Sequence, residues 1–431
     1  MSKEENRKKF FKYVSQNILG MIGFSCYVLA DSYFISIAKG ADGLTALNLV
    51  MPLYSIIFSI GEMIGVGSAI RYAISKIKKD ADADDYFWNA LIWCILSSML
   101  FVFAGIFFSA DIMRVLGADE HIVAVGNNYT KIFMCFAPMF MCNYVTNAFV
   151  RNDGAPGIAM SATLFSSLFN IVFDYILMFP MNLGMEGAAL ATALSPIIGM
   201  GICSIHFFSK KSSVRLVVCK PSVRKLVAGS QLGVSAFVGE MSSAVITLAF
   251  NFVILKLAGN VGVAAYGVVA NIAIVTTAVF NGVAQGSQPL ISSCFGRGDK
   301  DGCTQLKRMG YTTAFVLAAV MYSILFIFAG QFVAVFNSEG SEMLRLYATE
   351  GVKLYFIGIF FAGINIVGGG AFSATEDAFK AAVVSVARGF VLILGAVFVM
   401  SVLFGMTGVW LAYAVAEGIT TFIMLVMVLR V

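Results

Sequence analysis

Five acidic side chains lie deep inside long apolar stretches of the sequence, and no lysine or arginine is expected at equal depth. They are Asp31, Glu62, Asp174, Glu240 and Glu417. A charge buried in hydrocarbon costs a few kcal/mol or more, so such a residue commonly marks the path of an ion or a substrate. Acids without fixed basic partners need a mobile cation, a proton or neutral hydrogen-bond donors.

Two of these acids belong to a polar set at one level of the apolar stretches. Asp31 and Asp174 each lie seven residues before the outer end of their stretch, and Thr192 lies seven residues past the outer start of the next one. All three are therefore about 10 Å below the outer face, because a helix rises about 1.5 Å per residue. Asn170 precedes Asp174 by four residues, which places both on one helix face.

The oxygens of this set favour a small hard cation. Carboxylate, amide and hydroxyl oxygens suit Na⁺ by the ligand preferences that govern Ca²⁺ and Mg²⁺. The two acids suit a proton as well, because neighbouring carboxylates in a low-dielectric site resist carrying two charges. Asp31, Asn170, Asp174 and Thr192 are thus a candidate coupling site for Na⁺ or H⁺. For Asn170 and Thr192, a plain hydrogen bond between helices is the alternative.

Glu240 is expected near the middle of the membrane, where it would attract a cationic substrate or carry a second proton. A protonated glutamate that bonds to a neighbouring helix is the alternative. Glu62 and Glu417 are further candidates for the same role. A run of four acids in a polar loop is expected to be solvated and without function. The run consists of Asp80, Asp82, Asp84 and Asp85.

The elements that hold these residues are predicted to be membrane-spanning helices. The chain has 431 residues, of which 59% are hydrophobic and 12% are charged, and its mean hydropathy is +0.87. Soluble domains carry about 25% charged residues, so the composition excludes a soluble enzyme and a nucleic-acid binder. Eight cysteines without a C-x-x-C pair argue against a disulfide framework. No nucleophile–base or metal constellation indicates an enzyme.

Twelve apolar runs reach the roughly 20 residues that a helix needs to cross a bilayer. They cover residues 12–38, 47–75, 87–109, 122–150, 157–181, 185–208, 226–258, 262–295, 306–332, 345–373, 379–404 and 406–430. Lone strands would leave backbone groups unpaired in lipid, so the predicted fold is an all-α membrane protein. All but six of the 29 lysines and arginines fall on the side of the N-terminus. This bias predicts a cell-membrane protein with both termini in the cytoplasm.

The two halves of the chain resemble each other. Gly40 and Gly67-Ser68 align with Gly259 and Gly286-Ser287 at an offset of 219, and Gly184 aligns with Gly405 at an offset of 221. We therefore expect an N-lobe at 1–209, a basic cytoplasmic linker at 210–225 and a C-lobe at 226–431. Each lobe has six helices, so the repeats are parallel and pseudo-symmetric about an axis along the membrane normal.

The repeat provides an internal control for the coupling site. At the matching offsets, the second half has Phe250 for Asp31, Ile393 for Asn170, Val397 for Asp174 and Tyr413 for Thr192. A purely architectural set of polar residues should appear in both copies. Its absence from the second half favours one specialised ion site in the N-lobe.

Several segments together resemble the multidrug and toxic compound extrusion (MATE) family, in its DinF-like and MepA-like prokaryotic branch. They are Ala30-Asp31-Ser32-Tyr33-Phe34, Gly65-Val66-Gly67-Ser68, Phe149-Val150-Arg151-Asn152-Asp153-Gly154-Ala155-Pro156, Gly187-Ala188-Ala189-Leu190-Ala191-Thr192, and Gln285-Gly286-Ser287-Gln288-Pro289-Leu290. The resemblance covers nearly the whole chain. One departure is Gln16, which stands where many members have a proline in the first span.

The resemblance implies a secondary antiporter that exports organic cations and other amphipathic compounds in exchange for Na⁺ or H⁺. It implies that Asp31, Asn170, Asp174 and Thr192 form the N-lobe cation site and that Glu240 is the acid of the seventh span. No cofactor is expected beyond the coupling ion. We expect a lipid bilayer and small substrates as partners, no nucleic acid, and function as a monomer. The alternative is a lipid-linked oligosaccharide or lipid II flippase of the same superfamily, for which a cationic cavity is expected.

Overall fold

The computed structural model describes residues 3–336 and 341–429. Within these ranges the chain forms helices and connecting loops, without a strand. Arg430, the last position of the twelfth predicted span, lies outside the described residues. Helix starts follow the sequence: Pro156 occupies the first turn of α5, and the Asp119 side chain accepts a hydrogen bond from the backbone nitrogen of Ile122 at 2.8 Å to cap α3.

Seven helical segments make up the N-terminal half. They are α1 (Lys3–Lys78), which a break at Gly40 divides in two, α2 (Asp85–Val115), α3 (Glu120–Cys135), α4 (Ala137–Asn152), α5 (Pro156–Met178) and α6 (Gly184–Phe207). Gly40 has φ of 57°, a conformation that glycine adopts without the strain of a side chain. The helices α3 and α4 are bent by 46° and together form one broken span. The N-terminal half thus supplies six spans.

The C-terminal half repeats this arrangement. It contains α7 (Val223–Gly296), α8 (Lys300–Ile327), α9 (Ala329–Phe336), α10 (Glu342–Tyr355), η1 (Phe356–Gly358), α11 (Ile359–Ala374), α12 (Ala378–Val386), a π-helical turn η2 (Ala387–Val391) and α13 (Leu392–Leu429). With its 74 residues, α7 would be about 110 Å long, far more than one bilayer crossing. A break at Gly259, with φ of 62°, divides it into two spans, and Gly405 divides α13 in the same way. The twelve predicted spans are confirmed.

The two lobes meet along two seams between α1 and α7 that repeat each other. A Cβ atom placed on Gly67 would lie 2.1 Å from the carbonyl oxygen of Gly229 and 2.7 Å from the backbone nitrogen of Gly233. A Cβ atom placed on Gly233 would lie 2.0 Å from the carbonyl oxygen of Met63. A Cβ on Gly286 would lie 2.7 Å from Cα of Val14. Adding the repeat offset of 219 to positions 67 and 14 gives positions 286 and 233. The contact of Gly67 with Gly233 and the contact of Gly286 with Val14 therefore join the same pair of equivalent positions. The pseudo-symmetry predicted from the repeat is therefore built into the contact between the lobes.

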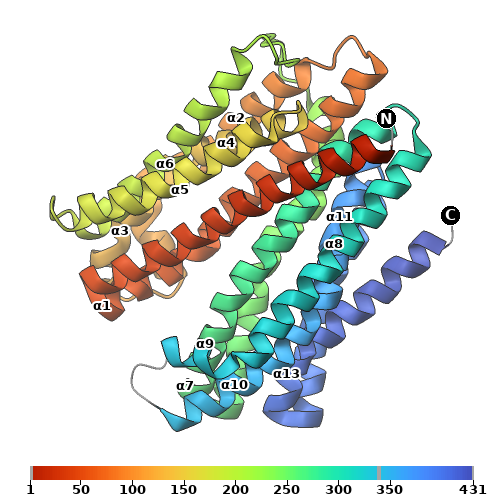
Figure 1. The fold of residues 1–431 in the computed structure, drawn as a ribbon. Helices are drawn as coiled ribbons and strands as arrows, with labels where there is room; N and C mark the ends of the chain where they lie inside the picture. The colour runs from red at the N-terminus through yellow and green to blue at the C-terminus, as the bar shows by residue number, and fades with distance from the viewer. Residues whose placement is uncertain (1–2, 337–340, 430–431) are drawn as a thin grey trace.

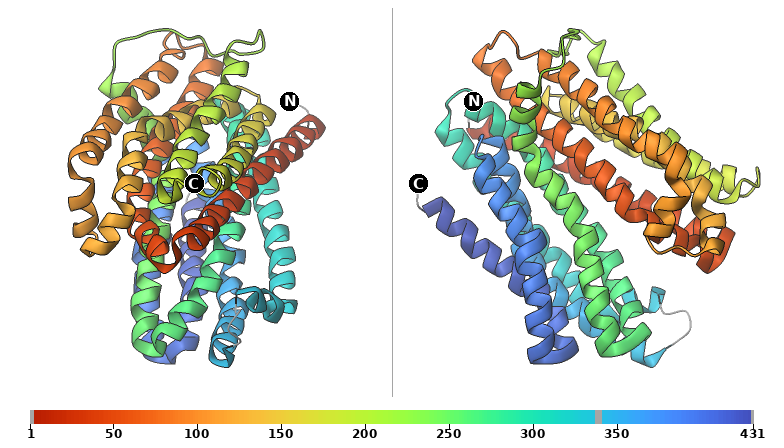
Figure 2. Two further views of the ribbon diagram at one scale, coloured as in Figure 1. Left: turned by 90° about the vertical axis from the view of Figure 1, so that its left-hand side faces the viewer. Right: turned by 180° about the vertical axis from the view of Figure 1, so that it is seen from behind.

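The lobes lie close together at one end and diverge toward the other. Figure 1 and the right-hand view of Figure 2 show this arrangement, with the N-terminal half of the chain in one arm and the C-terminal half in the other. The N-terminus lies at the end where the arms are close, and the mid-helix turns of α1 and α7 lie at the ends where the arms are apart. The exact division into an N-lobe ending at residue 209 and a C-lobe beginning at residue 226 stays a prediction.

The segment between the lobes is bound along the N-lobe. Oδ2 of Asp153 accepts hydrogen bonds from Nε2 of His206 at 2.8 Å and from the backbone nitrogen of Ser213 at 2.8 Å. In the acidic loop run, Asp84 accepts from the backbone nitrogen of Arg215 at 3.2 Å, and Asp85 forms an ion pair with Lys225. The expectation that this run is merely solvated is wrong for both acids, because the basic segment folds back onto it.

Candidate functional site

Three helices of the N-lobe bring the predicted coupling set together. Asp31 comes from the first half of α1, Asn170 and Asp174 come from α5, and Thr192 comes from α6. All four are buried, with exposed fractions of 6%, 0%, 0% and 1%. Nδ2 of Asn170 donates a hydrogen bond to Oγ1 of Thr192 at 3.2 Å, which links α5 to α6.

Four oxygens of this set have no hydrogen-bond partner in the described part of the chain. Oδ1 of Asp31, Oδ1 of Asn170 and both carboxylate oxygens of Asp174 are buried without a partner among the described residues. The Asp31 and Asp174 carboxylates also interact electrostatically with each other. Leaving buried acceptors unsatisfied costs about 1–3 kcal/mol each, more when they are charged. The chemistry of this donor set fits a cation or a shared proton, either of which would satisfy those oxygens.

Tyrosines beside the set were not identified from the sequence. Tyr54 and Tyr129 share a hydrogen bond between their hydroxyl groups, and the Tyr54 ring stacks on Phe133 at a centroid distance of 3.6 Å. Tyr27 lies within electrostatic range of Asp31 and of carboxylates on two other helices. Its position four residues before Asp31 is the signal that could have placed it on the same helix face.

The matching region of the C-lobe is packed with apolar and aromatic side chains. Phe250 and Ile393 are 0% and 1% exposed, and Val397 is 0% exposed. The Phe250 ring stacks on Tyr266 at 4.9 Å, and Tyr355 stacks on Tyr413 at 4.4 Å. This half of the pseudo-symmetric pair therefore holds an apolar core where the N-lobe holds unpaired carboxylate oxygens.

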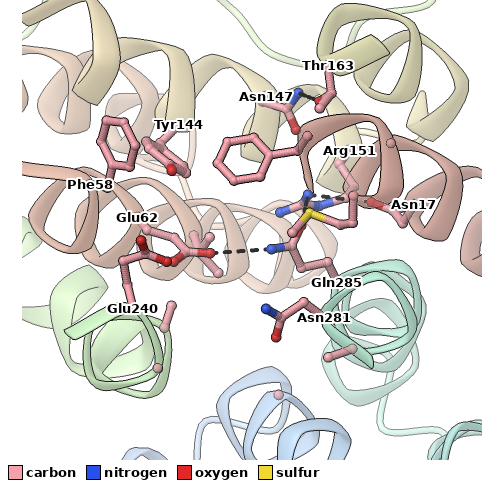
Figure 3. Close-up of a pocket in the computed structure, with 18 of the residues that line it drawn as sticks. Asn17, Phe58, Glu62, Tyr144, Asn147, Arg151, Thr163, Glu240, Asn281 and Gln285 are labelled. Carbon is pink, nitrogen blue, oxygen red and sulfur yellow. Dashed lines mark hydrogen bonds between the residues drawn. The ribbon is translucent and has the colours of Figure 1, made fainter. Parts of the chain in front are cut away.

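A cavity of about 240 Å³ lies between the two lobes and is lined by residues of both. Glu62 of α1 and Glu240 of α7 line it together, and their carboxyl groups lie beside each other in Figure 3. Phe58 and Tyr144 form part of the wall near these acids. A carboxylate beside aromatic rings is a favourable setting for an organic cation, because ring faces attract positive charge.

The expectation that the buried acids lack basic partners is wrong for Glu417. Nη2 of Arg388 lies 2.7 Å from Oε1 of Glu417, and Nδ2 of Asn365 donates to the same carboxylate at 2.6 Å. The side chains of Arg388 and Glu417 are 16% and 3% exposed. Arg388 lies in the π-helical turn of span eleven and is buried in the C-lobe, whereas the sequence placed it at the cytoplasmic end. Glu417 is therefore half of a buried ion pair.

Arg151 is a second basic residue that the sequence placed at the cytoplasmic end of a span. It is 5% exposed and lines the same cavity as Glu62 and Glu240. Its Nη1 donates to Oε1 of Gln285 at 2.6 Å, while its Nε has no partner among the described residues. The charges around the cavity are thus mixed, and not all acidic as the sequence indicated.

Comparisons with known proteins agree with this architecture. The MatE family model matches residues 17–176 and 236–399, and the two matched segments begin 219 residues apart. The chain is 27% identical over 414 residues to multidrug export protein MepA of Staphylococcus aureus, covering 93% of this chain and 89% of that protein. It is 26% identical over 409 residues to the protein of the same name from Staphylococcus saprophyticus, with the same coverage.

Solved structures share the fold at lower sequence identity. An outward-facing conformation of a multidrug resistance MATE family transporter superposes with a TM-score of 0.92 at 20% identity, covering 99% of this chain and 96% of that one. A MOP superfamily transporter from Pyrococcus furiosus, described as having a binding pocket of reverse polarity, gives a TM-score of 0.90 at 20% identity, covering 98% and 95%. The MatE family model matches more than half of this chain, in two segments that follow the internal repeat of the chain. The chain therefore belongs to the MATE family.

Proposed function

We propose that this protein is a secondary antiporter that exports organic cations and other amphipathic drugs in exchange for Na⁺ or H⁺. The observation that carries the proposal is the set of buried, unpartnered oxygens on Asp31, Asn170 and Asp174. A cation or a proton that binds there lowers the cost of burying the carboxylates, and it does so in the N-lobe alone. The relatives are named multidrug export proteins, which supports drugs as the substrate and export as the direction of transport.

The coupling site would hold Na⁺ through the carboxylates of Asp31 and Asp174, the amide oxygen of Asn170 and the hydroxyl of Thr192. The unpartnered state of four of these oxygens supports this assignment. A proton would instead reside on one of the two carboxyl groups. No cofactor other than this ion is proposed. One chain contains both lobes and the cavity between them, which supports function as a monomer.

The two seams support alternating access between the lobes as the transport mechanism. The lobes are closed where α1 and α7 meet through glycines, and they diverge at the other end. The bias of lysine and arginine supports a cytoplasmic location for the closed end, so this form faces outward. Ion and substrate binding must affect each other reciprocally, and each ligand must prefer a different form for exchange to occur.

Glu240 and Glu62 are the proposed substrate or second proton site, since both line the cavity. Glu417 is retained only as a residue that orients Arg388 beside that cavity. The flippase alternative calls for cationic groups that are free to bind phosphates. Arg151 and Arg388 do line the cavity, but Gln285 and Glu417 already engage them.

The test is efflux of a fluorescent organic cation from proteoliposomes, under an imposed Na⁺ gradient and, separately, under a pH gradient. We expect one gradient to drive efflux, and Asp31→Asn and Asp174→Asn each to abolish the coupling. Asp111→Asn is the matched control, because Asp111 is an exposed acid of the same lobe paired with Arg114. Efflux that stays coupled in both site variants would refute the N-lobe assignment and direct attention to Glu240. An absence of cation movement under either gradient would refute the antiporter.

A further inference from the structure

A single glutamine of the C-lobe reaches between two opposite charges of the N-lobe. Gln285 lies on the second span of α7, and its Oε1 accepts a hydrogen bond from Nη1 of Arg151 at 2.6 Å. Its Nε2 donates to Oε1 of Glu62 at 3.3 Å. Figure 3 shows this amide pointing toward Glu62. The bridge therefore joins the lobes through the same acid that we propose as a substrate ligand.

The bridge cannot persist when the lobes part at the seam. Gln285 directly precedes Gly286, where an added Cβ atom would lie 2.7 Å from Cα of Val14, so the two backbones pack closely at this point. Any separation of α7 from α1 at this point withdraws the amide from both Arg151 and Glu62. The bridge also occurs once, because the matching position in the N-lobe, at an offset of 219, is Val66.

We propose that Gln285 is a positioning residue that makes the cation affinity of Glu62 depend on the conformation of the transporter, an inference that rests on the proposed function. In this form, the Gln285 amide donates a hydrogen bond to an oxygen of Glu62 and holds the Arg151 guanidinium in the wall of the cavity. Both effects weaken the attraction of Glu62 for a cationic substrate. After the seam opens, Glu62 loses this donor, and a cationic substrate takes its place.

This arrangement gives an exporter what it needs at the two faces of the membrane. Tight binding alone moves nothing, because a ligand drives a two-state cycle only through its different affinity for the two forms. An amide that competes for Glu62 in the outward form favours release there. Its withdrawal in the inward form favours capture from the cytoplasm.

The test uses the full-length protein in nanodiscs and titrates it with ethidium, a fluorescent organic cation. Gln285→Leu removes the competing donor, so the Kd should fall about tenfold relative to the wild type, as for one lost hydrogen bond to a charged group. In proteoliposomes the KM should fall with it, and turnover should fall because release is slower. Gln285→Met, an unbranched replacement, keeps the test decisive should the leucine variant fail to fold.

Gln305→Leu is the matched control for a general loosening of the interface. Gln305 also bridges the lobes, accepting from Asn6 at 3.4 Å and donating to the carbonyl oxygen of Lys3 at 3.0 Å, but it does not line the cavity. Its Kd should stay within about twofold of the wild type. In a double-mutant cycle, Glu62→Gln should remove the affinity gained by Gln285→Leu.

An unchanged or weaker affinity in both Gln285 variants would overturn the inference, as would an equal gain in Gln305→Leu. Weaker binding would mean that Arg151 pairs with Glu62 once the amide is removed. These outcomes are separate from failure of the proposed function. If the wild type couples efflux to an ion gradient and the Gln285 variants bind like it, only the inference fails. If the wild type moves no cation under either gradient, both proposals fail.

Discussion

Replacing Gly233 by alanine tests the closed seam directly. The added Cβ atom would lie 2.0 Å from the carbonyl oxygen of Met63 and 2.7 Å from its carbonyl carbon. Both atoms belong to backbone, so no side chain can rotate away. Ordinary van der Waals contact begins at 3.4 Å, and the lobes must therefore separate locally by about 3.4 − 2.0 = 1.4 Å. Such overpacking costs about 1–3 kcal/mol, which corresponds to a shift of roughly 5–150-fold between two forms.

The assay is a distance distribution between spin labels at the closed ends of the two lobes, measured by double electron–electron resonance. Gly233→Ala should broaden this distribution toward longer distances and reduce the rate of exchange. Gly267→Ala is the matched control, because it lies on the same helix and a Cβ atom there meets nothing within 4 Å. Alanine favours helix over glycine by about 1 kcal/mol, so local helix stability should not fall in either variant. A wild-type distribution in Gly233→Ala would refute the idea that the glycine seam closes this end.

Three further predictions concern features away from the seam. Glu417→Gln should lower the melting temperature in detergent, because a buried Arg388 without its partner costs about 3–5 kcal/mol; the double replacement of both residues by leucine should recover most of the loss. Asp153→Asn should speed trypsin cleavage at 210–225, visible as half-length fragments on a gel, because the carboxylate accepts bonds from His206 and Ser213; cleavage at the wild-type rate would show that other contacts hold this segment. If Na⁺ is the coupling ion, it should raise the melting temperature of the wild type over K⁺ at equal ionic strength, and Asp174→Asn should lose that difference; an equal rise in the variant would place the ion elsewhere.

Much of the fold could be predicted because it depends on local composition. The lengths of the apolar runs predict the membrane spans. The repeat offset of 219 correctly pairs Gly40 with Gly259, and both are mid-helix breaks with positive φ. The membership of the candidate site was also within reach, since the depth of Asp31, Asp174 and Thr192 along their helices sets their common level. Their functional roles stay predictions.

The features that the sequence did not predict depend on contacts between distant residues, which no local sequence pattern encodes. Arg388, which pairs with Glu417, lies in a π-helical turn, and the helical spacing of the sequence gives no signal for that turn. The role of Gln285 depends on how one lobe packs against the other. The Tyr54–Tyr129 hydrogen bond joins residues that are 75 positions apart in the sequence. From the sequence alone, both look like ordinary aromatic residues of a membrane helix.

The paired seams also bear on how such a chain could have arisen. Two identical chains related by a two-fold axis form an isologous interface, in which a position on one copy contacts its partner position on the other, and the reverse contact also exists. The contacts of Gly67 with Gly233 and of Gly286 with Val14 have this form, with each lobe standing for one copy. A six-helix unit that formed a homodimer through this surface would carry two equivalent copies of the carboxylate set. In one chain the two halves are free to differ, and here the N-lobe has carboxylates where the C-lobe has an aromatic core.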